Sequence, residues 1–135
     1  MTKISGSCLC GAVSYSGDVT IKMTMNCHCT DCRKVTGAAY GTLLFMAEDE
    51  LMISGDLQSY HHKSDRGSNL TKLFCGTCGS QMFTRNSARP GLIGVRAGHL
   101  DQTDVVKPGA NLFGDSAIPS TKMDPDLPVH AKMPG

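Results

Sequence analysis

Short segments in which hydrophobic and polar residues alternate predict a fold built mainly from β-strands. Residues 19–25 place a hydrophobic side chain at every second position, which is typical of a strand with one buried face. Residues 12–16 predict an earlier strand, which would end in a hairpin turn at Gly17 and Asp18. Residues 40–46 form the most hydrophobic run, and its length suits a buried strand.

The rest of the chain continues this pattern of short strands and turns. Further strands are predicted at residues 51–54, 57–63, 69–74, 81–84 and 92–97. The polar segment 64–68 separates two of them, which indicates an antiparallel pair. The only helical signal is a turn at residues 31–35 that stops at Gly37, and prolines from Pro108 onward predict an irregular tail. The sequence therefore predicts a mainly β domain with little helix.

Length and composition fit one globular domain spanning residues 1–135. The chain is 40% hydrophobic, and 13 basic against 12 acidic residues leave a net charge of +1. A balanced charge and few aromatic residues argue against a nucleic-acid partner. Neither a membrane span nor a secretory signal is found, so we expect a cytoplasmic protein without a membrane partner.

The cysteine content is the first indication of chemistry. The chain has seven cysteines, an odd number that does not suit the paired disulfides of secreted scaffolds. They form three groups: Cys8 and Cys10; Cys27, Cys29 and Cys32; Cys75 and Cys78. Clustered cysteines in a cytoplasmic chain indicate a metal site.

The spacing within each group suits metal binding. The sequence Cys75-Gly-Thr-Cys78-Gly is typical of a zinc knuckle, whose glycines allow a tight turn around the ion. In an extended strand, residues two apart point to one side, so Cys8 and Cys10 could chelate one ion, as could Cys27 and Cys29. Seven thiolates divide most naturally into a closed site of four and an open site of three.

The cysteine pattern is also compatible with other interpretations. Spacing alone leaves other partitions of the cysteines open, and iron is an alternative to zinc, although thiolates disfavour magnesium and calcium. Buried free thiols and a redox-active pair at Cys75 and Cys78 are further alternatives. The paired spacing and the missing βαβ context favour zinc over both.

Charged and histidine side chains near the middle cysteines are secondary candidates. His28 lies between two ligands and would point away from the metal on an extended strand, so we expect a structural or supporting role. Arg33 and Lys34 follow the cluster directly, where positive charge would offset that of the thiolates; solvent exposure is an equally good interpretation.

Three linked motifs carry a resemblance to a known family. They are Ser7-Cys-Leu-Cys-Gly-Ala-Val13, Cys27-His-Cys-Thr-Asp-Cys-Arg-Lys34 with Gly37-Ala-Ala39, and Phe74-Cys-Gly-Thr-Cys-Gly-Ser80. In this order and spacing, they resemble the glutathione-dependent formaldehyde-activating enzyme family, which includes centromere protein V-type zinc domains.

The resemblance implies a fold and a site. It implies two small twisted antiparallel sheets in a zinc-stabilised β-tent, with two Zn²⁺ per chain. Cys8, Cys10, Cys75 and Cys78 would hold a structural zinc, and Cys27, Cys29 and Cys32 a catalytic one. The implied activity is that of a carbon–sulfur lyase, which adds glutathione to a small aldehyde such as formaldehyde to form S-hydroxymethylglutathione.

The implied partners are a small-molecule thiol and an aldehyde, and a homodimer is an open alternative to a monomer. Arg33 or Lys34 would receive a carboxylate of glutathione, which serves as thiol substrate or ligand. The tail departs from the family pattern, because Asn111 and Ser120 stand where relatives often have His and Trp. A non-catalytic binding module and a passive glutathione carrier are the alternative functions.

Overall fold

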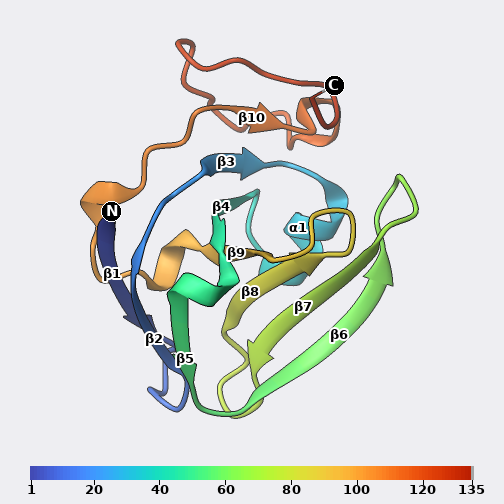
Figure 1. Ribbon diagram of the computed structural model, residues 1–135. Coiled ribbons are helices and arrows are strands. Elements are labelled where there is room, and N and C mark those ends of the chain that lie inside the picture. Colours follow the sequence, from blue (N-terminus) through green and yellow to red (C-terminus); the bar gives the residue numbers. More distant parts are fainter. Residues whose placement is uncertain (135) are drawn as a thin grey trace.

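Within residues 1–134, the computed structural model has two β-sheets, one short α-helix and a few 3₁₀ turns (Figure 1). The smaller sheet has the strand order β1-β2-β5 and is antiparallel throughout. Its strands are β1 (Thr2–Ser7), β2 (Ser14–Val19) and β5 (Leu51–Ser54). The prediction of a mainly β fold with two sheets is confirmed.

The larger sheet has seven strands in the order β10-β3-β4-β9-β8-β7-β6. They are β10 (Asn111–Leu112), β3 (Met23–Cys27), β4 (Gly41–Ala47), β9 (Leu92–Arg96), β8 (Gln81–Asn86), β7 (Asn69–Cys75) and β6 (Leu57–Lys63). The predicted antiparallel pairing of residues 57–63 with 69–74 is confirmed as β6 with β7. The pair β10–β3 is parallel, which alternation along single strands does not reveal.

One predicted turn is wrong. Gly17 lies inside β2, paired with Ile4 on one side, and the break comes later, between Val19 and Met23. A Cβ at Gly17 would lie only 2.4 Å from the carbonyl oxygen of Glu50, so glycine there permits close packing of the chain rather than a turn. The segment 19–25 is accordingly the end of one strand and the start of another.

The two faces of the larger sheet have different surroundings. Along β4, Leu44 and Met46 point toward the smaller sheet and join the main hydrophobic core, whereas Leu43 and Phe45 point the other way. The smaller sheet contributes Ile4 and Tyr15 to the main core. The main core therefore covers one face of the larger sheet, and the second face, on which Leu43 and Phe45 lie, is not part of that core.

The tail after Pro108 covers part of that second face. Its backbone follows β3, with hydrogen bonds from Asn26 N–H to Ala110 O and from His28 N–H to Leu112 O at 3.0 and 2.9 Å. Figure 1 shows the tail lying beyond β3, away from the smaller sheet. Its Leu112 packs with Met25 and Leu43 in a second, smaller hydrophobic cluster. No helix among residues 1–134 is long and hydrophobic enough to cross a membrane.

Candidate functional site

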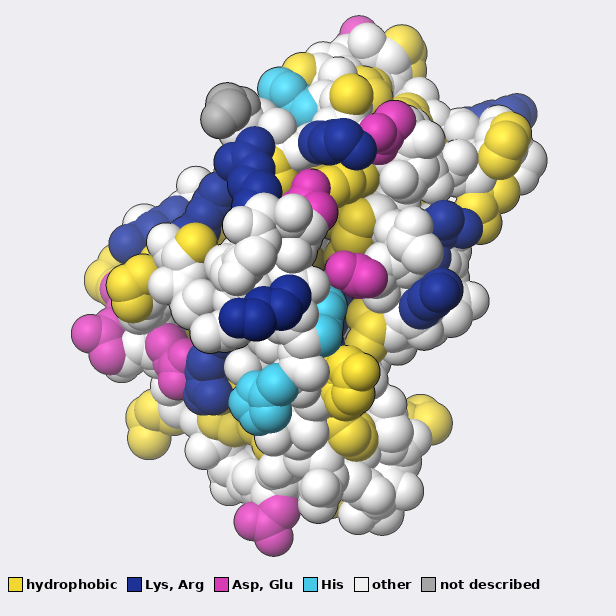
Figure 2. Space-filling model, turned by 90° about the vertical axis from the view of Figure 1, so that its right-hand side faces the viewer, with side chains coloured by type: hydrophobic (Ala, Val, Ile, Leu, Met, Phe, Trp, Pro, Cys, Tyr) yellow, Lys and Arg dark blue, Asp and Glu magenta, His cyan; other side chains and the backbone are white. Residues whose placement is uncertain are grey.

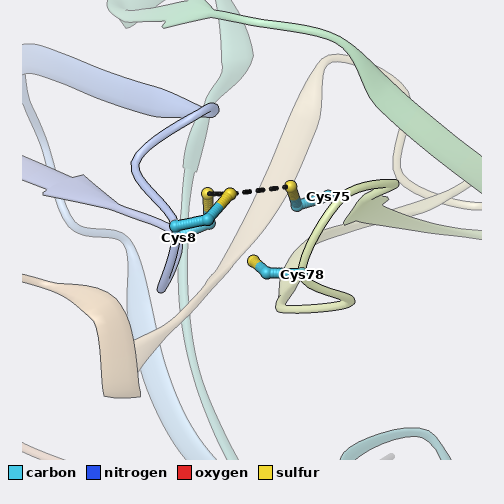
Figure 3. A group of neighbouring side chains, drawn as sticks. Cys8, Cys75 and Cys78 are labelled. Atoms are coloured by element: carbon cyan, nitrogen blue, oxygen red, sulfur yellow. Dashed lines mark hydrogen bonds between the residues drawn. The ribbon is translucent and has the colours of Figure 1, made fainter.

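Four cysteines from distant segments meet beside the main core. Cys8 and Cys10 lie in the loop after β1, Cys75 ends β7, and Cys78 follows in the next turn. Their sulfur atoms all lie within 4.8 Å of one another. Cys8 and Cys10 are 3.7 Å apart at sulfur, as are Cys10 and Cys75. Figure 3 shows Cys8 in one loop pointing toward Cys75 and Cys78, which lie together on the turn opposite.

These distances fit a tetrahedral zinc ion. With Zn–S bonds of about 2.3 Å, the edges of a tetrahedron of sulfurs are about 3.8 Å long. A disulfide would instead need an S–S distance of about 2.05 Å, and all seven cysteines are free. The donor set of Cys8, Cys10, Cys75 and Cys78 therefore suits a closed zinc site, and we call these residues the closed cluster.

Local backbone geometry holds the closed cluster in place. The Val13 N–H donates to the Cys8 sulfur at 3.2 Å. The Gly79 N–H donates to the Cys75 carbonyl at 2.8 Å, which closes the turn between Cys75 and Cys78. Gly79 has a φ of +78°, a conformation that glycine adopts without strain. The Ser80 hydroxyl and backbone N–H lower the pKa of the Cys78 thiol to about 5, which favours the thiolate that a metal needs.

The expectation that the C-x-C pairs lie on extended strands is wrong. Cys8 is followed by a turn, closed by a hydrogen bond of 3.1 Å from the Gly11 N–H to the Cys8 carbonyl. Cys27 ends β3, whereas Cys29 is the N-cap of the helix α1 (Thr30–Thr36). Turns, rather than strands, therefore bring the two sulfur atoms of each C-x-C pair together.

The middle cysteines form a second group of three. The sulfur atoms of Cys27, Cys29 and Cys32 lie within 4.8 Å of one another, and we call these residues the open cluster. The Cys29 sulfur accepts a hydrogen bond from the Cys32 N–H at 3.2 Å, so the helix cap itself positions one thiolate. α1 ends at Gly37, with a φ of +72°, as the sequence predicted.

Two buried cations accompany the open cluster. Lys72 and Arg96 are only 6% and 5% exposed, and Lys72 donates to the Thr84 hydroxyl at 3.2 Å. Hydrogen bonds with Cys27 and Cys29 lower the pKa of the Cys32 thiol, and the positive charges of Arg96 and Lys72 lower it further. Burial lowers the pKa of the Lys72 ammonium, an effect that the neighbouring thiolates of Cys32 and Cys29 oppose.

His28 anchors the segment between two ligands. Its Nε2–H donates to the Asn111 Oδ1 at 2.9 Å, and its ring packs on Tyr40 with centroids 4.7 Å apart. Both His28 and Asn111 are 1% exposed. Asn111 therefore ties the tail to the open cluster from within the protein.

A cavity of about 550 Å³ opens beside the open cluster, and Cys27, Cys29 and Cys32 form part of its wall. Its floor is the second face of the larger sheet, including Lys72 and Thr84. Figure 2 shows hydrophobic side chains exposed between basic and acidic ones on this side of the molecule. The volume is in the range of small-molecule sites.

Several candidate residues lie outside this wall. The residues lining the cavity do not include Arg33, Lys34, Asn111 or Ser120, and Ser120 is exposed in the tail. Sequence reasoning missed Lys72 and Arg96. The only available signal was that each is a charged residue within a predicted strand. Whether such a residue points to the same face of the sheet as the middle cysteines is known only once the strands are paired.

The fold and its two cysteine clusters define a small two-sheet β protein with two centres that could each hold a metal ion. The chain belongs to the glutathione-dependent formaldehyde-activating enzyme family, whose family model matches residues 3–116. The resemblance of the three motifs to this family is thereby confirmed.

Comparison with solved structures supports the fold. The crystal structure of a Rhodobacter sphaeroides protein superposes with a TM-score of 0.56 over 93% of this chain and 98% of the other. The two sequences are 19% identical, so the likeness concerns the fold alone. A search of curated proteins gave no significant match.

Proposed function

We propose that this protein is a zinc-dependent carbon–sulfur lyase that forms and cleaves the adduct of glutathione, or a similar thiol, with a small aldehyde such as formaldehyde. The observation that carries this proposal is the position of the open cluster, whose three sulfurs line a cavity large enough for a small molecule. A site with three protein ligands leaves one coordination position for a substrate, whereas the closed cluster has none to offer.

The open cluster would hold the catalytic zinc through Cys27, Cys29 and Cys32, and the closed cluster the structural one. A zinc ion with three thiolate ligands supplies a position at which a substrate thiol is held as thiolate near neutral pH. The protein contributes the placement of both reactants in one cavity, which reduces the entropy cost of bringing them together.

Charged residues of this chain would orient the thiol substrate. Lys72 on the cavity floor offers a positive charge to a carboxylate or to the developing alkoxide. Arg33 and Lys34 stay as proposed contacts of a glutathione carboxylate, reached from α1 beyond the cavity wall.

The reaction itself is an addition in which all atoms are retained. The sulfur forms a bond to the carbonyl carbon, the π electrons of the carbonyl move to its oxygen, and the thiol proton ends on that oxygen. With formaldehyde the product is S-hydroxymethylglutathione. Cleavage is the same sequence in reverse.

The test is the exchange rate between formaldehyde, glutathione and their adduct, measured by nuclear magnetic resonance with and without the protein. We expect acceleration by the wild type and by the control variant Ser120→Ala, and none by Cys29→Ser. Binding of glutathione without acceleration would favour a passive carrier, and absence of both would favour a binding module; either result would overturn the proposed activity.

A further inference from the structure

The wall of the cavity is more hydrophobic than the proposed formaldehyde reaction requires. Seven hydrophobic side chains other than alanine and cysteine line it: Met25, Leu43, Phe45, Leu70, Leu92, Phe113 and Met133. They come from the strands of the second face and from the tail, whose Phe113 and Met133 pack against the cluster of Met25 and Leu43. A one-carbon aldehyde has no group that could cover such a wall.

The charged residues of the same cavity favour an anion. Four lining side chains are basic and two are acidic. Lys132 is paired with Asp115 at 3.0 Å, whereas Arg66, Lys72 and Arg89 have no ion-pair partner among residues 1–134. An occupant with one or more carboxylates would therefore find basic partners at the cavity in addition to the hydrophobic wall.

We propose, building on the function proposed above, that the preferred substrate is an anionic thiol adduct whose sulfur-bound carbon carries a sizeable hydrophobic group. The sulfur would lie at the open cluster, the carboxylates at the basic residues, and the hydrophobic group against Phe45, Leu70 and the tail. The adduct forms from an aliphatic or aromatic aldehyde by the addition already described, with the thiol proton ending on the former carbonyl oxygen.

Binding of unreactive thioethers tests the cavity separately from catalysis. S-hexylglutathione and S-methylglutathione carry the same charges and differ only in apolar length. We expect calorimetry to show that the hexyl compound binds the wild-type protein at least about tenfold more tightly. The variants Leu70→Gln and Met133→Gln should reduce this ratio several-fold, whereas Met52→Gln, at an exposed position outside the cavity, should leave it unchanged.

Equal binding of the two thioethers, or a preference unaffected by both cavity variants, would overturn this inference. Folding of each variant is checked by circular dichroism, and Met133 in the tail provides the test if Leu70→Gln does not fold. Catalysis with formaldehyde but no hexyl preference would leave the proposed function intact and remove only the substrate class. A hexyl preference without turnover of any aldehyde would remove the function and keep the binding specificity.

A second observation concerns the buried guanidinium of Arg96. None of its three nitrogens has a hydrogen-bond partner among residues 1–134. A Cβ at Gly41 would lie 2.6 Å from the Arg96 Nη1, and Gly41 pairs with Cys27 across β3 and β4. The guanidinium is therefore packed closely behind the open cluster, where glycine leaves room for it.

We also infer that Arg96 is a positioning residue for the open cluster, to which it donates hydrogen bonds at the cysteine sulfurs when a metal is bound. Three thiolates and one divalent cation have a net charge of −1, which a buried guanidinium compensates. A buried cation without hydrogen-bond partners is energetically costly. The thiolates of the open cluster would supply the partners that the guanidinium of Arg96 lacks in the part of the chain that the structure describes.

Cobalt substitution measures this role without any substrate. We expect Arg96→Met to weaken cobalt binding at the open cluster about 10–100-fold and to shift its sulfur-to-cobalt absorption, with the closed cluster unaffected. Arg96→Lys should restore part of the affinity, and the exposed control Arg85→Met should behave as wild type. Unchanged affinity and absorption in Arg96→Met would overturn the inference. If that variant does not fold, a wild-type cobalt affinity in Arg96→Lys would overturn it equally.

Discussion

The two cysteine clusters lie on opposite faces of the same sheet. Cys75 ends β7 on the face of the main core, to which it belongs together with Leu73. Cys27 ends β3 on the face of Met25, where the tail and the cavity lie. One cluster therefore has four protein ligands beside the main core, with Cys10 at the surface, whereas the other has three and adjoins space for a ligand.

The clusters also differ in how they connect the chain. The closed cluster joins Cys10 to Cys75, which are 65 positions apart, so a bound metal there closes a long loop and restricts the unfolded chain. The open cluster takes all its ligands from residues 27–32 and crosslinks almost nothing. A metal in the closed cluster should therefore stabilise the fold, and a metal in the open cluster should serve chemistry.

The largest expected effect is loss of the fold when the closed cluster is broken. Cys75→Ser removes one of four ligands, and structural zinc contributes on the order of 10–16 kcal/mol, as much as the whole stability of a typical domain. Far-ultraviolet circular dichroism should show an unfolded chain. The matched variant Cys29→Ser should keep the β spectrum and lose one metal ion; unfolding of Cys29→Ser alone would reverse the comparison.

The next largest effect is expected on chelation, which should remove the metal ions of the two clusters in two distinct steps. A chelator of moderate affinity should remove one metal ion per chain from the open cluster, which has only three ligands, while the circular dichroism spectrum is unchanged. A stronger chelator should remove the second ion and unfold the protein. Mass spectrometry under native conditions counts the ions at each stage, and simultaneous loss of both with unfolding would contradict two distinct roles.

A smaller effect is expected at the anchor of the open cluster. Asn111→Ala removes the acceptor of the buried His28 N–H, which should lower the free energy of unfolding by about 1–3 kcal/mol. Because His28 stands between two ligands, metal affinity should fall at the open cluster and stay unchanged at the closed one. Denaturant unfolding and metal competition measure these quantities, with Ser120→Ala as control; a wild-type metal affinity would contradict the anchoring role.

The smallest effect is a pH dependence on the core side of the sheet. His99 Nε2–H donates to the Met82 carbonyl, and in the neutral ring Nδ1 accepts from the Tyr15 hydroxyl. Burial lowers the pKa of His99 from its ordinary value of 6.5. Below about pH 6.5 the unfolded chain therefore binds a proton that the folded protein does not, and stability falls as pH decreases.

Denaturant unfolding between pH 7.5 and about 5.5, with metal content checked at each pH, measures this slope. The slope should not exceed about 1.4 kcal/mol per pH unit for one histidine, and it should decrease in His99→Gln. An identical slope in the variant and the wild type would show that other groups, such as the metal ligands, determine the acid sensitivity.

Part of the fold could be predicted from local pattern because strands and turns are encoded over a few residues. The strands at 51–54 and 57–63 and the end of α1 at Gly37 are where the sequence placed them. The interpretation failed at Gly17, where the requirement for glycine comes from Glu50, a residue distant along the chain. Turn signals describe local conformation and carry no information on such packing.

The sequence by itself determined which side chains could hold metal, since cysteines at short spacing are a local property. The spacing favoured a division into four and three, and the resemblance to the family assigned the members of each group. Only the tertiary structure decided that the two groups occupy opposite faces of one sheet and that one of them adjoins a cavity. Lys72 and Arg96 come to the open cluster through strand pairing, as does the hydrophobic wall. The physical reason is that pairing register, which depends on the whole chain, fixes which face of a sheet each side chain points to.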